Sequence, residues 1–77
     1  NLDECERMIK QEFEIECACA GRDDLMYVYV LDENLKEPVG QYLSKKMNLH
    51  HSAFKLVVIN EIPKNKSGKI QYKELPL

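Results

Sequence analysis

The residues with the clearest chemical potential lie near the end of this sequence, where Ile62–Leu75 reads IPKNKSGKIQYKEL. Four lysines are spread through this stretch: Lys64, Lys66, Lys69 and Lys73. A lysine side chain is a flexible stem that carries a compact positive charge, which suits it to phosphate and carboxylate oxygens. The stretch is therefore a phosphate-binding loop, a solvated basic segment, or the carrier of a single catalytic lysine.

The pair Gly68-Lys69 does not belong to a nucleotide-binding P-loop. That motif places another glycine five residues before the Gly-Lys pair and a serine or threonine directly after it. Here those two positions hold Pro63 and Ile70. The sequence also contains no glycine-rich dinucleotide motif and no nucleophile elbow, so the lysines themselves remain the candidates.

Cysteine and histidine side chains are the other groups that could do chemistry. Cys17, Cys19, His50 and His51 lack the paired Cys-x-x-Cys spacing of zinc sites, and adjacent histidines point in different directions. The chain has three cysteines, an odd number, and its first residues have no secretory features. We therefore expect no metal site and no disulfide framework, with the cysteines buried as small hydrophobic side chains and the histidines exposed.

Length and charge narrow the class of protein. The 77 residues suffice for one small domain, so we expect residues 1–77 to form a single domain. The formal net charge of -2 argues against a nucleic-acid-binding domain, which normally presents a basic face. No apolar run approaches the roughly 18 residues of a membrane span, and the polar start does not resemble a signal peptide. We therefore expect a cytoplasmic protein that neither binds nucleic acid nor spans a membrane.

The hydrophobic periodicity of the first half predicts one helix and two strands. Residues 2–13 carry apolar side chains at helical spacing, after Asn1, which begins a capping-box pattern. The period then changes to two, which predicts a strand over residues 14–19, and a turn follows at Gly21–Asp24. Residues 25–31, LMYVYVL, are apolar on both faces, as in a central strand that pairs with the one before it.

The second half predicts the remaining elements. Pro38 is placed as the first residue of a second helix, because its fixed φ and missing N–H fit that position. Residues 54–59, FKLVVI, predict a third strand, and a short helical turn is expected around residues 71–75. The predicted fold class is α+β: a small three-stranded sheet flanked by two helices, with a C-terminal lysine loop and a short terminal helix.

The lysine loop resembles the last signature motif of the adenylate-forming enzymes. Pro63, Ser67–Ile70 and Leu75 match the pattern Leu/Ile-Pro-Lys-Thr-x-Ser/Asn-Gly-Lys-Ile-x-Arg-x-x-Leu, directly after a predicted strand. This superfamily includes acyl-CoA synthetases, the adenylation domains of nonribosomal peptide synthetases, and luciferases. The stretch from Leu2 to Glu6 resembles the start of its C-terminal domain, a small α+β lid. The resemblance covers nearly the whole chain and implies that residues 1–77 are this lid domain.

The resemblance implies that Lys69 is the catalytic residue. In adenylation a carboxylate attacks the α-phosphorus of ATP, and a lysine that enters from the lid neutralises the negative charge gathered there. The same resemblance implies a substrate and nucleotide loop that presents this lysine, formed by Pro63, Ser67, Gly68 and Ile70. The implied activity is that of an ATP-dependent acid–thiol ligase similar to acyl-CoA synthetases.

Other residues of this segment also bear on the implied site. Lys64 and Lys66 are candidate secondary contacts with nucleotide or thiol substrate, and solvated surface charge is the alternative for both. Tyr72 departs from the family pattern, because the usual residue two positions after Ile70 is arginine. The neighbouring Lys73 could supply a charge, although its side chain would point in a different direction.

The resemblance also implies partners outside this chain. These are the chain's own N-terminal adenylation domain, a carboxylic acid, ATP with Mg²⁺ held mainly by that domain, and either coenzyme A or a carrier protein's phosphopantetheine as acyl acceptor. Gly21–Asp24 resembles the Gly-Arg-x-Asp-Asp motif that precedes the family's interdomain hinge, but a strand and a helix follow it here, so we interpret it as a turn. We expect the hinge and the large domain upstream of Asn1. We expect residues 1–77 alone to be folded but inactive.

Two alternatives to the acyl-CoA synthetase reading stay open. One is the lid of a peptide-synthetase adenylation domain, although Ser67 favours a coenzyme A ligase over the asparagine common in peptide synthetases. The other is a stand-alone, non-catalytic interaction module.

Overall fold

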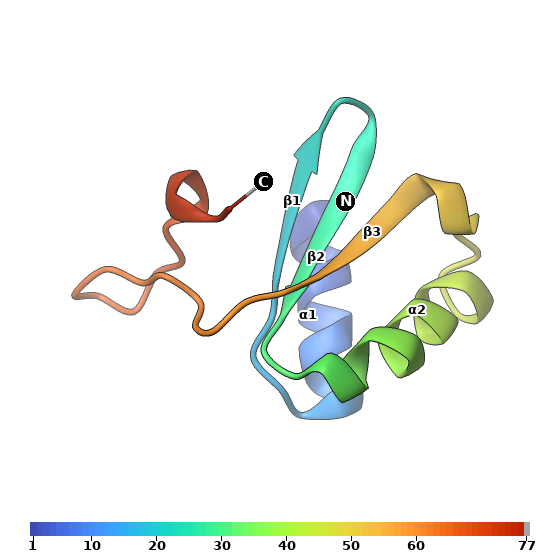
Figure 1. Ribbon diagram of the computed structural model, residues 1–77, viewed down its shortest axis with the longest axis horizontal. Coiled ribbons are helices and arrows are strands. Elements are labelled where there is room, and N and C mark those ends of the chain that lie inside the picture. Colours follow the sequence, from blue (N-terminus) through green and yellow to red (C-terminus); the bar gives the residue numbers. More distant parts are fainter. Residues whose placement is uncertain (77) are drawn as a thin grey trace.

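The computed structural model describes residues 1–76, which form two α-helices and a three-stranded mixed sheet with short 3-10 turns (Figure 1). The main elements are α1 (Leu2–Phe13), β1 (Ala18–Arg22), β2 (Leu25–Val30), α2 (Lys36–Lys45) and β3 (Phe54–Val58). The 3-10 turns span Glu33–Leu35, His51–Ala53 and Tyr72–Glu74. The α+β fold class and the predicted order of elements are confirmed.

The sheet has the order β1-β2-β3, so the apolar strand β2 is central as predicted. β1 and β2 are antiparallel and are joined by Asp23 and Asp24, whose φ values of 54° and 62° are those of a type I′ hairpin turn. β2 and β3 are parallel, and α2 lies in the connection between them. In this register Val28 lies between Cys19 of β1 and Leu56 of β3.

Helix α1 has the bounds that its sequence predicts. The Asn1 side chain accepts a hydrogen bond of 3.0 Å from the Glu4 amide, and Glu14 ends the helix in the left-handed conformation, with φ 53°. Helix α2 begins at Lys36, two residues before the predicted start at Pro38. The 3-10 turn Glu33–Leu35 leads directly into α2, and Pro38 is accommodated in the first turn, where backbone N–H groups have no intrahelical partner.

The first strand differs most from the prediction. Residues 14–17 cross from α1 to the sheet, and β1 runs over residues 18–22 instead of 14–19. The predicted turn at Gly21–Asp24 therefore shrinks to Asp23 and Asp24, since Gly21 and Arg22 pair with β2. The tight two-residue turn sets this register, and the period-two pattern alone did not locate it.

Both faces of the sheet are covered. On one face the two helices enclose a first core, made up of Cys5, Ile9, Cys17, Cys19, Val28, Val30, Val39 and Leu43. On the other face the C-terminal segment encloses a second core of Ala18, Tyr29, Ile62 and Leu75. All three cysteines are buried and free, which confirms their expected role as small hydrophobic side chains. No helix within residues 1–76 is long and apolar enough to cross a membrane.

Candidate functional site

The lysine segment folds into a hairpin that projects from the body of the protein (Figure 1). The Gln71 amide donates to the Pro63 carbonyl at 2.8 Å, and the Asn65 amide donates to the Lys69 carbonyl at 2.9 Å. Lys64 and Ile70 are bridge partners between these two bonds. The hairpin, residues 63–71, thus has a tip of three residues, 66–68. We call it the lysine hairpin.

Asn65 and Gly68 determine the shape of the tip. The Asn65 side-chain oxygen accepts hydrogen bonds from the amides of Ser67, at 2.9 Å, and Lys69, at 3.0 Å. The Gly68 amide donates to the Asn65 carbonyl at 3.0 Å, and the Gly68 φ of 84° lies in the left-handed region. A turn followed by a left-handed glycine is a common three-residue hairpin connection. Asn65, which stands where the quoted motif has threonine, therefore organises the tip.

The base of the lysine hairpin is held in the second core. Ile62 and Leu75 are buried there, and Ile70 packs against them. The Tyr29 hydroxyl donates a hydrogen bond of 2.5 Å to the Pro76 carbonyl, which ties the end of the segment to the central strand. The hairpin therefore rises from a fixed base on the sheet face opposite the helices.

The structure separates the lysines of the hairpin by their partners. Lys64 forms an exposed ion pair with Glu16, and its hydrogen bond and charge lower the pKa of that carboxyl. Lys66 and Lys69 are exposed, and the ion pairs formed within residues 1–76 do not include either of them. Lys66 and Lys69 are thus available to an anion from elsewhere, and Lys64 already has a carboxylate partner.

A buried carboxylate is hydrogen-bonded to the residue that follows the lysine hairpin. Glu6 of α1 is only 9 % exposed, and its carboxylate accepts from the Cys19 amide at 2.9 Å and from Lys10 Nζ at 3.3 Å. The Tyr72 hydroxyl donates to it as well, at 2.9 Å to Oε2 and 3.1 Å to Oε1. We call Glu6 and these three donors the Glu6 cluster. It gives Tyr72, the departure from the family pattern, a definite bonding role.

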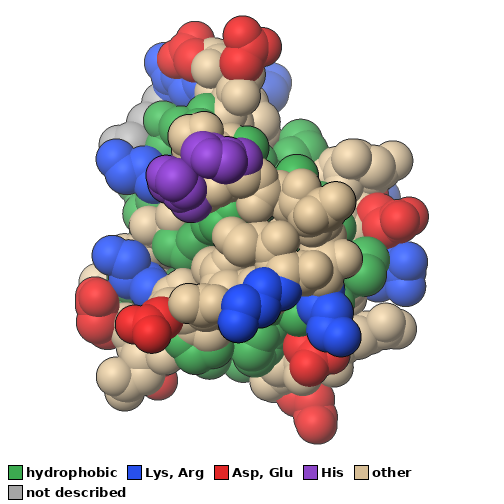
Figure 2. Space-filling view, turned by 90° about the vertical axis from the view of Figure 1, so that its right-hand side faces the viewer, with side chains coloured by type: hydrophobic (Ala, Val, Ile, Leu, Met, Phe, Trp, Pro, Cys, Tyr) green, Lys and Arg blue, Asp and Glu red, His purple; other side chains and the backbone are tan. Residues whose placement is uncertain are grey.

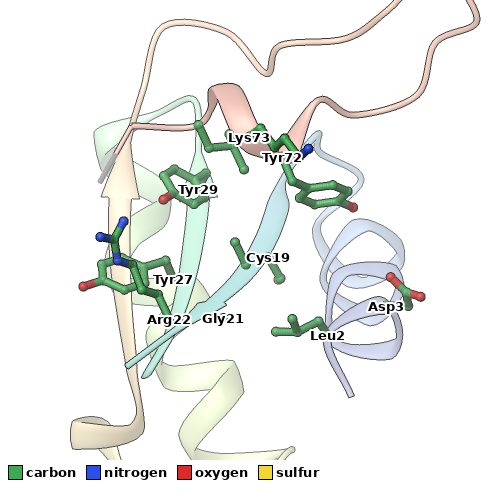
Figure 3. A pocket seen from close by; sticks show the side chains of 11 residues that line it. Leu2, Asp3, Cys19, Gly21, Arg22, Tyr27, Tyr29, Tyr72 and Lys73 are labelled. Carbon is green, nitrogen blue, oxygen red and sulfur yellow. The ribbon is translucent and has the colours of Figure 1, made fainter. Parts of the chain in front are cut away.

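The Glu6 cluster was missed by the sequence reasoning, although one signal was present. Leu2, Glu6, Ile9 and Phe13 have the spacing of a single helical face, so a carboxylate stands in the apolar stripe of α1. Burial of its hydroxyl and the hydrogen bond to Glu6 raise the pKa of Tyr72 to about 12. Tyr72 as a whole is 42 % exposed, and its hydroxyl turns toward α1 (Figure 3). The neutral phenol is therefore the form that suits this contact.

A groove opens between the start of α1, the edge strand β1 and the C-terminal segment (Figure 3). Its volume is about 520 Å³, and its lining residues include Tyr27, Tyr29 and Tyr72. Arg22 and Lys73 bring positive charge to it, Asp3 brings negative charge, and Lys69 is not among its lining residues. The groove and the lysine hairpin are thus separate features.

The histidines lie away from the lysine hairpin. His50 and His51 are both exposed, as predicted, with ring centres 4.2 Å apart, and Figure 2 shows them side by side on the surface. His50 Nδ1 lies 2.8 Å from the Ser52 hydroxyl. In the described part of the chain, no three His, Cys, Asp or Glu residues are grouped so that they could hold a metal ion.

Comparisons with family models, curated proteins and solved structures returned no match for this chain.

The chemistry available at the lysine hairpin is electrostatic. The hairpin combines a fixed base, a hydrogen-bonded tip and two exposed ammonium groups, which suits the delivery of positive charge into an anionic site on another surface.

Proposed function

We propose that residues 1–77 are the C-terminal lid domain of an AMP-forming acid–thiol ligase that resembles acyl-CoA synthetases, with Lys69 as its catalytic residue. The observation that carries this proposal is the way the hairpin holds Lys69. Its amide donates to the Asn65 side chain and its carbonyl accepts from the Asn65 amide. Both backbone polar groups are thus held, and the exposed side chain remains free to reach a partner.

The same geometry distinguishes Lys69 from Lys66. Lys66 lies within the three-residue tip, whereas Lys69 directly follows the left-handed Gly68 and starts the strand that returns to the second core. A catalytic cation is more effective when its backbone is preorganised, because less reorganisation is needed as charge develops. Lys69 therefore suits a catalytic role, and Lys66 suits at most a secondary contact with phosphate.

In the proposed reaction a carboxylate oxygen attacks the α-phosphorus of ATP. A new oxygen–phosphorus bond forms, the bond to the bridging oxygen breaks, and pyrophosphate leaves with that electron pair. The Lys69 ammonium would offset the negative charge that the two anions bring together, and the exclusion of water by the closed lid would strengthen this effect. ATP, its Mg²⁺ and the acid would be held mainly by a large N-terminal domain.

The second half of the proposed reaction does not need Lys69. The acyl group would pass from AMP to the thiol of coenzyme A or of phosphopantetheine, after a lid movement that withdraws the hairpin. The thiol would give up its proton to water, its sulfur would form the thioester bond, and AMP would leave with the electron pair of the broken acyl–phosphate bond. Loss of Lys69 should therefore affect adenylation selectively.

ATP–pyrophosphate exchange by the intact ligase tests the proposal. Lys69→Ala should lower the exchange rate by about 100-fold or more, the usual effect of removing one group that stabilises transition-state charge. Lys66→Ala is the matched control, because it removes another exposed cation from the same hairpin, and it should change the rate by less than about threefold. Thioester formation from a supplied acyl-adenylate should survive in both variants.

Two results would contradict the proposal. The first is undiminished exchange by a folded Lys69→Ala variant, since a surface lysine would then explain the residue. The second is an equal loss in Lys66→Ala and Lys69→Ala, because that would indicate a diffuse basic patch without a specific catalytic lysine. Circular dichroism should show native folding in both variants, since both side chains are exposed.

A further inference from the structure

The Glu6 cluster joins elements that lie far apart in the sequence. Tyr72 and Glu6 are separated by 66 positions, and their hydrogen bonds connect the C-terminal segment to helix α1. The Cys19 amide, 13 positions from Glu6, brings β1 into the same cluster. A buried carboxylate needs such partners, because removing it from water without compensating hydrogen bonds is costly.

The acceptor in this cluster is held in place from two other directions. The Cys19 amide donates at 2.9 Å, and Lys10, one helical turn further along α1, lies 3.3 Å away. These contacts keep the Glu6 carboxylate oriented whether or not Tyr72 is bonded to it. Tyr72 therefore meets a preformed acceptor on a rigid element, and the bond positions the segment that carries Tyr72.

That segment is the 3-10 turn Tyr72–Glu74, which directly follows the outgoing strand of the lysine hairpin. Tyr72 directly follows Gln71, whose amide closes the base of the hairpin on the Pro63 carbonyl at 2.8 Å. Lys69 lies three positions before Tyr72. The contacts of Ile62, Ile70 and Leu75 in the second core bury apolar area but are not directional, whereas a hydrogen bond specifies an orientation.

The incoming strand has a contact with the same part of the fold. Lys64 pairs with Glu16, which lies in the stretch between α1 and β1. This pair is exposed on both sides and is therefore a weak constraint. The Tyr72 contact is part-buried and ends on a carboxylate that is almost fully enclosed. It is thus the stronger of the two polar links between the hairpin and the α1–β1 unit.

We propose that Tyr72 is a positioning residue, and that its hydrogen bond to Glu6 sets the orientation of the lysine hairpin on the domain. The link to catalysis rests on the proposed function of Lys69, and the link to hairpin order does not. Tyr72→Phe removes the hydroxyl and keeps the ring, so it tests the hydrogen bond without opening a cavity.

Residue-resolved amide hydrogen exchange on the 77-residue chain tests the positioning role directly. Tyr72→Phe should raise the exchange rates of the Gln71 and Leu75 amides by about three- to tenfold, as expected for the loss of one hydrogen bond. The Cys19 amide should keep its protection, because Glu6 still accepts from it. Tyr27→Phe is the matched control, because it removes a hydroxyl from the lining of the same groove but outside the Glu6 cluster.

A second variant separates a hydrogen-bond donor from a tyrosine-specific effect. Tyr72→Arg places a guanidinium opposite Glu6, where it can form a charge-assisted pair, and it should restore the protection of the Gln71 and Leu75 amides. Two results would overturn the proposal: exchange in Tyr72→Phe that equals that of the wild type, or exchange in Tyr72→Arg as fast as in Tyr72→Phe.

Kinetics of the intact ligase connect the contact to Lys69. Tyr72→Phe should lower kcat for adenylation by about three- to tenfold, with KM for ATP and for the acid unchanged, because a misplaced lysine affects the transition state and not ground-state binding. If Lys69→Ala leaves adenylation intact while Tyr72→Phe still loosens the hairpin, the proposed function fails and the positioning contact stands. If Lys69→Ala abolishes adenylation while Tyr72→Phe neither loosens the hairpin nor lowers kcat, the positioning role fails and the proposed function stands.

Discussion

Substitution of Gly68 by alanine should destabilise this protein, although the new methyl group has room. An ideal Cβ at Gly68 would meet nothing within 4 Å outside its own chain neighbours, so there is no clash with the surrounding structure. The φ of 84° is the whole cost, because a residue with a Cβ loses about 1–2 kcal/mol in the left-handed conformation. Part of this is offset because alanine also restricts the unfolded chain, so a net loss of about 1 kcal/mol is expected.

Gly40 provides a matched control with the opposite sign. It lies inside α2, where a Cβ would be 3.8 Å from Phe54 Cε1 and 4.0 Å from Leu56 Cδ2, both ordinary van der Waals contacts. Gly40→Ala should therefore stabilise the protein by about 0.5–1 kcal/mol, the usual gain when alanine replaces glycine inside a helix. The two Gly→Ala variants should thus differ by about 2 kcal/mol, with the wild type between them.

Urea unfolding, followed by circular dichroism, measures this difference. With a slope of about 1 kcal/mol per molar urea, the unfolding midpoints of the two variants should be separated by about 2 M. Gly68→Asn should fall between wild type and Gly68→Ala, because asparagine tolerates the left-handed region better than alanine does. A Gly68→Ala variant as stable as the wild type would refute the reasoning, because it would place Gly68 in an ordinary backbone conformation.

Three further outcomes follow from packing and charge. Ile9→Ala, which empties a fully buried position of the first core, should cost about 2–5 kcal/mol in urea unfolding. The folded state raises the pKa of Tyr72 to about 12 from 10. The contribution of its neutral hydroxyl to the free energy of unfolding is therefore fully present below pH 10 and is lost as the pH rises through 12. Tyr72→Phe should therefore lose less stability than the wild type between pH 8 and pH 11. Lys64→Met should change stability by less than about 1 kcal/mol, because its ion pair with Glu16 is exposed.

Each of these outcomes can fail in a recognisable way. A loss below about 1 kcal/mol for Ile9→Ala would contradict the enclosed packing of α1 against the sheet. If Tyr72→Phe and the wild type lose the same stability at alkaline pH, folding does not raise the pKa of the Tyr72 hydroxyl. A loss above about 2 kcal/mol in Lys64→Met would mean that the pair with Glu16 is buried.

Helix α1 and the central strand could be predicted from the sequence, because the spacing of apolar residues within a short stretch indicates each of them. The capping residue Asn1 and the apolar period defined α1 to the residue, since both signals act within one or two helical turns. The run 25–31 was recognised as the central strand because it is apolar on both faces. The bounds of β1 were not predicted correctly, because the turn at Asp23–Asp24 and the pairing with β2 decide them. The alternating pattern of β1 alone is compatible with more than one strand register.

The candidate site divides in the same way. The motif around Lys69 singled out one lysine. The position of Gly68 in a turn is also a local property, because it depends on residues next to it in the chain. The pairing of Lys64 with Glu16 across 48 positions, and of Tyr72 with Glu6 across 66, appeared only in the tertiary structure. Such contacts join segments whose approach depends on how both faces of the sheet are covered. The sequence motif alone thus pointed to Lys69, and the packed fold decided which side chains hold its hairpin in place.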